Sequence, residues 1–342
     1  MDEPLDPSLP LAPIRRIAAY GICRDSEDNV LLVRASLSTG TPGAWSLPGG
    51  AVAHGENPRD TVVRETAAET GLSVAIDDLQ DVSADLRALP DRGLAIHTDR
   101  LIYRVRQRGG ALIDRVGQST DLCRWMSMAD AEAVSLRPFT AIAIGLPPAA
   151  IDLQPDEAPE MPSFHAVPGP DGLHRTQRFA AYAVARDSAD RVLLTRVADG
   201  YPGAGRWHLP GGGTDFGEAP GPALLRELHE ETGQDGRLVR LLGVASHRDA
   251  ASLGPEGYPI DWHGVRAFYL VEIAAPTEPT VHDVGGSTGE ARWFTPAEIA
   301  ALDPAGDMTE VTAEALAANG TTSRRRTTAS RRPRTARTHH AR

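Results

Sequence analysis

Runs of apolar residues recur in the same order in two parts of the chain. In the first part, the mostly apolar residues 14–24 are followed by a short polar segment and by a second apolar run at 30–34. The same order returns at residues 179–186 and 191–196. Short runs rich in β-branched residues and leucine, bounded by polar turn residues, are typical of β-strands. Each part is therefore predicted to open with a β-hairpin.

A loop rich in glycine and proline follows each predicted hairpin, and a helix of about fourteen residues follows each loop. Pro58 and Pro220 stand near the start of these helices, where the missing N–H of proline costs little. Gly71 and Gly233 stand where the helices end, and a helix C-cap favours a residue that adopts the left-handed conformation. These signals predict one such helix in each part.

Further strand-like runs follow the predicted helices, at residues 95–105 and 264–273. A strand and a short helix are predicted to close each part, at 124–136 and 292–302. Strands flanked by two helices predict a mixed sheet between helical layers. The expected fold class is therefore α/β, with an α/β/α sandwich in each half of the chain.

The two parts are copies of one sequence, which we call the first and the second repeat. Arg16-Ile-Ala-Ala-Tyr20 returns as Arg178-Phe-Ala-Ala-Tyr182, 162 positions later. Solenoid repeats are much shorter, about 20–50 residues, so this period indicates a duplicated domain. The predicted organisation is a first domain at residues 10–147, a proline-rich linker at 148–172, a second domain at 173–305 and a tail at 306–342.

The composition narrows the class of protein. The formal net charge is −11 and hydrophobic residues make up 41%, but no apolar stretch is long enough to predict a membrane span. The first residues are acidic and contain proline, so no signal peptide is expected. Cys23 and Cys123 are too few for a disulfide framework and are expected to be small buried residues rather than nucleophiles. These features indicate a cytoplasmic protein.

The tail differs from the remaining chain in charge. Residues 321–342 contain eight arginines and no acidic residue. A segment rich in arginine, serine and threonine cannot bury a core, so the tail is predicted to be disordered. One interpretation is an arm that binds nucleic acid or an acidic partner. The interpretation that we favour is a solvated tail beside an acidic protein.

Three carboxylates share one face of the helix predicted in the second repeat. Glu227, Glu230 and Glu231 stand at i, i+3 and i+4, and residues at this spacing are neighbours on a helix surface. Because like charges repel, the arrangement does not stabilise the helix by itself. A divalent cation would convert the repulsion into ligation, and hard oxygen ligands suit Mg²⁺ or Mn²⁺. This face is a candidate metal site.

The residues around this face resemble the Nudix box, the signature of the Nudix hydrolase family. The spacing is Gly212-x5-Glu218-x7-Arg226-Glu227-x-x-Glu230-Glu231-x-Gly233. The resemblance covers both repeats and implies tandem Nudix domains; enzymes of this family cleave a diphosphate linkage with Mg²⁺ or Mn²⁺. Gln234 departs from the family, which prefers an aliphatic residue there, and is expected to weaken packing at the helix end.

The resemblance also implies roles for individual residues. Glu227, Glu230 and Glu231 look like the metal ligands, and Glu227, Arg226 and Glu231 are the expected catalytic residues. Glu227 or a carboxylate outside the box would act as general base on the attacking water. Arg226 would orient a glutamate of the helix by a charge-assisted hydrogen bond. Glu218 is expected to support the geometry of the loop and helix rather than to bind the metal.

The glycine loop before the helix is the expected substrate-binding element. Gly211, Gly212 and Gly213 let the backbone approach a phosphate or carboxylate closely. Trp45 and Trp207, which precede the loop in each repeat, are interpreted as core residues rather than as platforms for a nucleobase.

Other positions leave alternatives open. An outer carboxylate is expected to assist the box, and the candidates are Glu290, Asp283 and Glu256. His208 adjoins the glycine loop, where contact with a substrate phosphate and simple exposure to solvent are both consistent with the sequence.

The first repeat departs from the box at one ligand position. Ala68 stands where the second repeat has Glu230, and Glu65 and Glu69 remain on the helix face as candidate metal ligands. Loss of one carboxylate weakens the hold on a metal ion that must offset phosphate charge. The first repeat is therefore expected to bind metal and nucleotide weakly and to be slow or inactive.

The sequence thus predicts a hydrolase that cleaves a diphosphate linkage in a nucleoside diphosphate derivative or a nucleoside triphosphate, mainly in the second domain. Mg²⁺-dependent attack of water on phosphorus is the expected reaction. The alternative is a non-catalytic nucleotide sensor with a nucleic-acid-binding basic tail. A nucleotide-type small molecule is the expected partner, and no membrane partner is expected. Neither the individual substrate nor the oligomeric state follows from the sequence.

Overall fold

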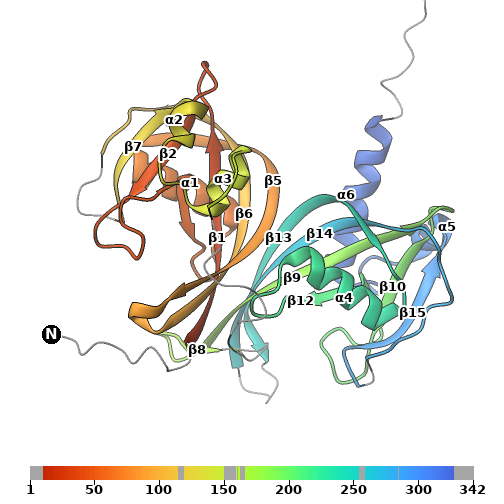
Figure 1. Cartoon of the computed structure of the whole chain (residues 1–342). Coiled ribbons are helices and arrows are strands. Elements are labelled where there is room, and N and C mark those ends of the chain that lie inside the picture. Colours follow the sequence, from red (N-terminus) through yellow and green to blue (C-terminus); the bar gives the residue numbers. More distant parts are fainter. Residues whose placement is uncertain are drawn as a thin grey trace, which may run out of the picture. The chain divides into compact units, whose positions relative to one another are not determined.

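The computed structural model describes residues 11–114, 119–149, 159, 161, 166–253, 259–283 and 285–326 (Figure 1). The chain packs as two compact units, the first made of Met1–Tyr182, Gly211–Glu227 and Leu238–Tyr269, and the second of Ala183–Pro210, Leu228–Arg237 and Leu270–Arg342. The boundary between these units passes through the second repeat, so the units do not coincide with the repeats of the sequence.

The first repeat is a mixed α/β structure with two sheets. In one sheet the strand order is β4-β1-β6-β5, with β1 parallel to β6, and in the other it is β3-β2-β7. The elements are β1 (Ala12–Cys23), β2 (Val30–Ala35), β3 (Trp45–Ser46), β4 (Gly49–Ala51), α1 (Pro58–Thr70), β5 (Leu72–Leu89), a 3₁₀ turn (Pro90–Arg92), β6 (Leu94–Gly110), β7 (Thr120–Met126), α2 (Met128–Glu132) and α3 (Pro138–Ile144).

From β9 on, the described strands and α-helices of the second repeat follow the order of those in the first. Its strands follow the order β11-β10-β9-β14-β13, with β12 and β8 paired to β9 and β15 paired to β10. The elements are β8 (Val167–Pro168), β9 (His174–Asp187), β10 (Val192–Val197), β11 (Trp207–His208), β12 (Gly211–Gly213), α4 (Pro220–Thr232), β13 (Arg237–Leu253), β14 (Pro259–Ile273), β15 (Thr288–Phe294), α5 (Pro296–Ala301) and α6 (Glu310–Arg326). β8 lies inside the segment predicted as a linker.

The predicted hairpin at the start of the first repeat is wrong, although both of its strands exist. β1 and β2 belong to different sheets, and a single bridge between Arg24 and Val30 joins their ends. The reason is that β4 pairs along one edge of β1 and β6 along the other. Both edges of β1 are therefore occupied over Ala18–Tyr20, and β2 does not pair there.

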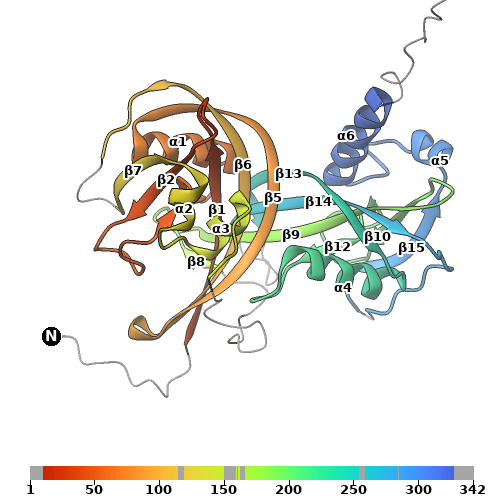
Figure 2. The ribbon, with the colours of Figure 1, turned by 45° about the horizontal axis from the view of Figure 1, so that its top comes forward.

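The sequence pattern missed the long strands β5 and β13. β5 forms the edge of its sheet and appears as a long curved strand in Figures 1 and 2. Most of its side chains are exposed or only half-buried, so the strand lacks the apolar run on which the prediction relied. A strand that is half solvated and charged carries a weak hydrophobic signal.

The predicted box helix of the first repeat is confirmed as α1. The side chain of Asn57 accepts a hydrogen bond from the Arg59 N–H, and Pro58 occupies the first turn. The helix ends at Gly71, whose φ of 77° is left-handed. A capping side chain, a proline at the start and a left-handed glycine at the end together define the ends of α1.

Apolar residues of both sheets meet in the core of the first repeat. Tyr20 of β1 and Leu32 of β2 are buried there, with Phe139 of α3 packed against them. Cys23 and Cys123 are buried and free, as predicted, and burial raises the pKa of both thiols. Neither cysteine is therefore prepared for nucleophilic attack at neutral pH.

The expectation of a disordered segment beginning at residue 306 is wrong for its first part. α6 and the residues just before it lie close to β11 in space. Trp207 forms a parallel bridge with Met308, and Val311 and Ala315 of α6 are buried. The spacing of Met308, Val311 and Ala315 is typical of one helix face. The prediction overlooked it because it was based on the arginine-rich residues 321–342. Residues 327–342 of the predicted tail lie outside the described residues. Within the described chain, no helix combines the length and apolar character needed to cross a membrane.

Candidate functional site

The box arginine of the second repeat is held by two glutamates. Arg226 donates from Nε and Nη2 to the carboxylate of Glu218, at 3.0 and 2.8 Å, and from Nη1 to Glu227, at 3.1 Å. Burial raises the pKa of Glu218, but hydrogen bonds from Arg226 and the Asp215 N–H outweigh it, so the pKa is lowered overall. Hydrogen bonding to Glu218 in turn raises the pKa of Arg226. The charged pair thus fixes the start of α4 beside the loop.

Glu218 contacts both the loop and the helix of the box. Its carboxylate also accepts a hydrogen bond from the Asp215 N–H at 3.0 Å, so it joins the loop before α4 to the first turns of the helix. The same arginine donates to Glu227, the residue expected to meet the metal and the water. Bidentate contacts between arginine and carboxylate fix direction as well as distance.

The glycine loop is β12, and its backbone conformation requires glycine. Gly211 has φ of +130°, and a Cβ there would lie 2.2 Å from the Ala181 carbonyl oxygen. A Cβ on Gly212 would meet the Glu227 carboxylate carbon at 2.8 Å, so this backbone lies directly against the box helix. A Cβ on Gly213 would overlap the guanidinium of Arg178. The loop therefore approaches charged groups more closely than any other residue type permits.

The two remaining box glutamates of α4 are held differently. Glu231 is buried and accepts a hydrogen bond of 2.6 Å from the hydroxyl of Thr288 on β15. Glu230 is half-buried, and its backbone carbonyl accepts hydrogen bonds from the N–H groups of His282 and Asp283. Nothing in the sequence pattern marked Thr288, because a threonine at a strand start is common.

The carboxylates of α4 offer the oxygen donors that a hard divalent cation prefers. Glu227 lies against the backbone of Gly212, where an added Cβ would come within 2.9 Å of both carboxylate oxygens, so no side chain stands between this carboxylate and the loop. Among the described residues, however, no three His, Cys, Asp or Glu side chains are gathered closely enough to hold a metal ion. The donor chemistry of these carboxylates fits Mg²⁺.

The first repeat reproduces the support of the box but not its acidic face. Arg64 donates from Nε and Nη2 to Glu56, at 2.7 and 2.8 Å, and also bonds Glu65. The hydrogen bond from Arg64 lowers the pKa of Glu56 to about 2. Ala68 has no side-chain oxygen that could bind a metal ion, so Glu65 and Glu69 are the box carboxylates left on α1.

Glu69 of the first repeat is in an environment that disfavours its charge. It is buried, and the Gly49 N–H donates to its carboxylate at 2.9 Å. Burial, reinforced by the negative charge of Glu65, raises the pKa of Glu69 to about 8 despite this hydrogen bond. At neutral pH in the absence of metal, the side chain is mostly protonated and is a poor ligand for a cation.

We expect Glu69→Gln to stabilise the metal-free protein near and above neutral pH. The pKa of Glu69 is higher in the folded state than in the unfolded state, so its contribution to stability is present below about pH 4.5 and is lost as the pH rises through about 8. Because glutamine does not ionise, it avoids this loss, and the free energy of unfolding is expected to rise by up to about 3 kcal/mol at pH 7. Thermal unfolding in EDTA at pH 5, 7 and 8.5 measures the effect. Equal melting temperatures at pH 8.5 would contradict it.

The candidate outer carboxylates lie at different places. Glu290 pairs across the strands with Arg196 of β10, and the two side chains form an ion pair of 3.6 Å. Asp283 lies at the end of α4, where its N–H donates to the Glu230 carbonyl. Glu256 lies outside the described residues. The register places Glu290 of β15 where the first repeat has Leu122 of β7, so the difference between the repeats extends beyond the box.

The aromatic and histidine side chains near the loop have structural contacts. Trp207 packs edge-on against Phe294, with ring centroids 4.7 Å apart, and Trp45 is part of the core of the first repeat. His208 Nδ1 lies 2.7 Å from the hydroxyl of Thr309 and 3.1 Å from that of Thr312. These hydrogen bonds tie His208 to the start of α6.

The expected weakening of packing at Gln234 is wrong. The side chain is almost fully buried and makes hydrogen bonds in both directions with Thr277, from Nε2 to the hydroxyl at 2.8 Å and from the Thr277 N–H to Oε1 at 2.9 Å. A buried polar side chain with satisfied groups does not destabilise its surroundings.

Comparison with known proteins finds the same domain twice. The model of the NUDIX domain matches residues 14–143 and again 176–315. Human diphosphoinositol polyphosphate phosphohydrolase 3-alpha is 43% identical over 75 residues, which are 22% of this chain and 43% of the human protein. Mouse diphosphoinositol polyphosphate phosphohydrolase 2 is 40% identical over 73 residues, 21% of this chain and 39% of the mouse protein. The chain thus spans less than half the length of these curated relatives.

Two solved structures each match less than half of this chain. A MutT NUDIX hydrolase from Burkholderia pseudomallei is 31% identical and covers 41% of this chain and 96% of its own, with a TM-score of 0.31. The NUDIX domain of Shewanella oneidensis NrtR, complexed with ADP ribose, is 18% identical and covers 45% of this chain and 92% of its own, with a TM-score of 0.35.

Proposed function

Since this chain belongs to the NUDIX family and carries two tandem NUDIX domains, we propose that it hydrolyses a diphosphate linkage in a nucleoside diphosphate derivative or a nucleoside triphosphate. The second repeat carries the activity in this proposal. The observation that supports it is the set of contacts in which Arg226 holds Glu227 against the Gly212 backbone, on a helix that also bears Glu230 and Glu231. The first repeat has alanine at one of these positions.

Glu227, Glu230 and Glu231 would hold a Mg²⁺ or Mn²⁺ ion in the proposed site. When bound, such an ion offsets the charge of the diphosphate and lowers the pKa of a water molecule. The residues of the chain position the reactants: Arg226 aims the Glu227 carboxylate, and β12 presents its backbone to the phosphates. Glu227 accepts a proton from the attacking water in this scheme.

The relatives support a substrate with a diphosphate group. The curated proteins that match this chain are named as phosphohydrolases of diphosphoinositol polyphosphate. A diphosphate linkage is the feature that such a substrate shares with a nucleoside diphosphate derivative. We propose the linkage as the reacting group, with the nucleotide as the substrate class.

Thr288→Val is expected to lower kcat/KM by about tenfold or more. The substitution keeps the size of the side chain but removes the donor to Glu231, and a hydrogen bond to a charged group contributes about 1.5–3 kcal/mol. Thr120→Val is the matched control, because Thr120 occupies the same register position in the first repeat and its buried hydroxyl makes no hydrogen bond among the described residues. Steady-state kinetics would contradict the assignment if both variants lost activity equally.

The proposed function is tested by hydrolysis of a nucleotide panel. The full chain is incubated with Mg²⁺ and with nucleoside triphosphates, ADP-sugars, dinucleoside polyphosphates and NADH, and the products are separated by chromatography. Turnover of at least one compound that EDTA abolishes is the expected result. No turnover of any compound with Mg²⁺ or Mn²⁺ would overturn the proposal.

A further inference from the structure

The box loop of the second repeat, residues 214–218, is held by polar side chains of the first repeat. His97 Nδ1 lies 2.7 Å from the Gly217 nitrogen and accepts its N–H. The guanidinium of Arg15 donates to the carbonyl and to the hydroxyl of Thr214. All of these residues belong to the first compact unit. The first repeat, although its own box lacks a carboxylate, thus contributes contacts to the second box.

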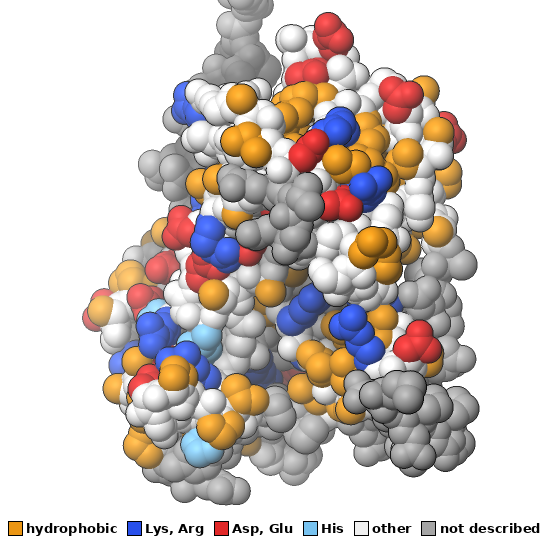
Figure 3. Space-filling model, turned by 90° about the vertical axis from the view of Figure 1, so that its left-hand side faces the viewer, with side chains coloured by type: hydrophobic (Ala, Val, Ile, Leu, Met, Phe, Trp, Pro, Cys, Tyr) orange, Lys and Arg blue, Asp and Glu red, His pale blue; other side chains and the backbone are white. Residues whose placement is uncertain are grey.

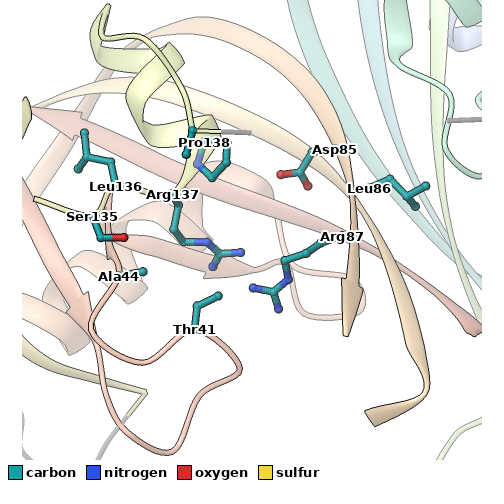
Figure 4. Close-up of a pocket in the computed structure, with 10 residues that line it drawn as sticks. Thr41, Ala44, Asp85, Leu86, Arg87, Ser135, Leu136, Arg137 and Pro138 are labelled. Carbon is teal, nitrogen blue, oxygen red and sulfur yellow. The ribbon is translucent and has the colours of Figure 1, made fainter. Parts of the chain in front are cut away.

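The sheet of the first repeat brings these side chains together. Arg15 of β1 is the register partner of His97 on β6, and Asp99 stands two positions further along β6. Alternate residues of a strand share one face, so the three side chains lie on the same face of the sheet. Leu86 of β5 also pairs with His97. Figure 4 shows the Leu86 side chain on the other side of β5 from that of Arg87, so His97 lies on the opposite face of the sheet from Arg87.

Asp99 fixes the ring of His97. Both side chains are fully buried, and the Asp99 carboxylate lies 3.1 Å from His97 Nε2. Arg15 donates to the same carboxylate, at 3.0 and 3.2 Å. Burial raises the pKa of Asp99, but the charge of Arg15 and the hydrogen bonds outweigh it, so the pKa is lowered overall. Because the Gly217 N–H can only donate, Nδ1 accepts and the ring proton is at Nε2, where Asp99 accepts it.

The hydrogen bond at Gly217 is connected to the acidic helix through Glu218. Glu218 is the next residue along the chain, and its carboxylate accepts two hydrogen bonds from Arg226. Arg226 also donates to Glu227, the residue that meets the water in the proposed reaction. A displacement of about 1 Å in a catalytic group can lower a rate by about 10²-fold. The contact of His97 with the loop therefore bears on the position of Glu227.

The same contact occurs in the opposite direction. His263 lies in β14, the strand that corresponds to β6, and its Nδ1 accepts the N–H of Gly55 at 3.0 Å. Gly55 belongs to the box loop of the first repeat and stands 162 positions before Gly217. Each repeat thus supplies a buried histidine to the equivalent glycine of the other repeat. Contacts that are repeated with the partners exchanged are typical of a twofold-related interface, so the contact of His97 is part of the fold rather than incidental.

The two directions differ in charge. Gln177 stands 162 positions after Arg15. Its side-chain amide donates to the Val52 carbonyl at 3.2 Å, as Arg15 does to the equivalent carbonyl of Thr214. Arg15 is charged and is held by Asp99, and hydrogen bonds from a charged donor are roughly twice as strong as those between neutral groups. The loop of the intact box is therefore held more firmly than the loop of the defective one.

We propose that His97 and Arg15 are positioning residues for the box of the second repeat, an inference that rests on the proposed function of that box. The first repeat acts as a built-in support for the catalytic loop rather than as a second active site. A role in binding nucleic acid would instead require a basic surface. Figure 3 shows acidic and basic side chains intermingled on one face of the molecule, and the described side chains of that face form no region of a single charge.

Hydrogen–deuterium exchange of the full chain tests the positioning without any substrate. His97→Leu removes the acceptor of the Gly217 N–H, so the exchange of residues 214–218 is expected to become about tenfold faster or more. The matched control is His263→Leu, which is expected to accelerate exchange at residues 52–56 instead. Exchange at residues 214–218 that is unchanged in His97→Leu, or that rises equally in both variants, would overturn the proposal.

Steady-state kinetics with the best panel substrate test the consequence for catalysis. His97→Leu is expected to lower kcat by about tenfold or more with little change in KM, and His263→Leu to stay within about twofold of the wild type. His97→Asn keeps an acceptor near the position of Nδ1 and is expected to recover most of the lost kcat, which a general loss of stability would not allow. Equal kcat in the wild type and His97→Leu would refute the positioning role.

Arg15→Gln covers the case in which His97→Leu does not fold. Glutamine is the residue at the equivalent position of the second repeat, where its amide makes the same carbonyl contact. The substitution removes the charge that binds Asp99 and is expected to accelerate exchange at residues 214–218 and to lower kcat, both severalfold. Unchanged exchange at these residues would count against the proposal. A wild-type chain without turnover would contradict the proposed function alone, because the exchange measurements still decide whether the loop is held.

Discussion

Glu227→Gln is expected to lower kcat/KM by about 10²–10³-fold, which corresponds to about 3–4 kcal/mol of transition-state stabilisation. Glutamine keeps the size of the side chain and an acceptor for Arg226, whose Nη1 lies 3.1 Å from the carboxylate. It removes the negative charge that would hold a metal ion and accept a proton. The loss should therefore appear in kcat and in the Mg²⁺ concentration needed for half-maximal rate.

The counterpart in the first repeat supplies the control for this prediction. Glu65 stands at the equivalent position of α1, and Arg64 bonds it as Arg226 bonds Glu227. Glu65→Gln is expected to leave kcat/KM within about twofold of wild type, because the first repeat lacks a third box carboxylate. A loss of the same size in both variants would show that the two boxes share the reaction.

Gly211→Ala is expected to destabilise the protein by about 3 kcal/mol or more. Two effects add at this position: a φ of +130°, which side chains rarely adopt, and a Cβ only 2.2 Å from the Ala181 carbonyl oxygen. The obstacle is backbone of the neighbouring strand β9, which cannot move without breaking the sheet. Chemical denaturation of the full chain measures the change in the free energy of unfolding.

A second glycine separates this effect from the general cost of alanine in a strand. Gly243 lies in β13 with nothing within 4 Å of an added Cβ, so Gly243→Ala is expected to change stability by less than about 1 kcal/mol. If Gly211→Ala were equally mild, β12 would not be held against β9 as the contacts indicate.

The box and its helix could be predicted because their signals are local. Helix caps at Asn57 and Gly71, and the spacing of Arg226 and the glutamates, act within a few residues of each other along the chain. The sequence predicts that Glu218 supports the loop and helix and that Arg226 orients a glutamate of the helix, but it does not predict that these two residues bond each other. Where a pattern lies within one turn of a helix, the spacing along the sequence determines which side chains are neighbours.

Contacts between distant segments could not be predicted in the same way. The partner of Glu231 is Thr288, 57 positions away, and a threonine has no motif of its own. The edge strand β5 escaped detection because water solvates much of it.

The measurement that tests the account most directly is hydrolysis of the best panel substrate by the full chain, with one box disabled at a time. Glu231→Gln and Glu69→Gln change equivalent residues, buried on α4 and α1. We predict that Glu231→Gln abolishes Mg²⁺-dependent turnover and that Glu69→Gln retains it. Turnover that survives Glu231→Gln but is lost in Glu69→Gln would assign catalysis to the first repeat and contradict the account.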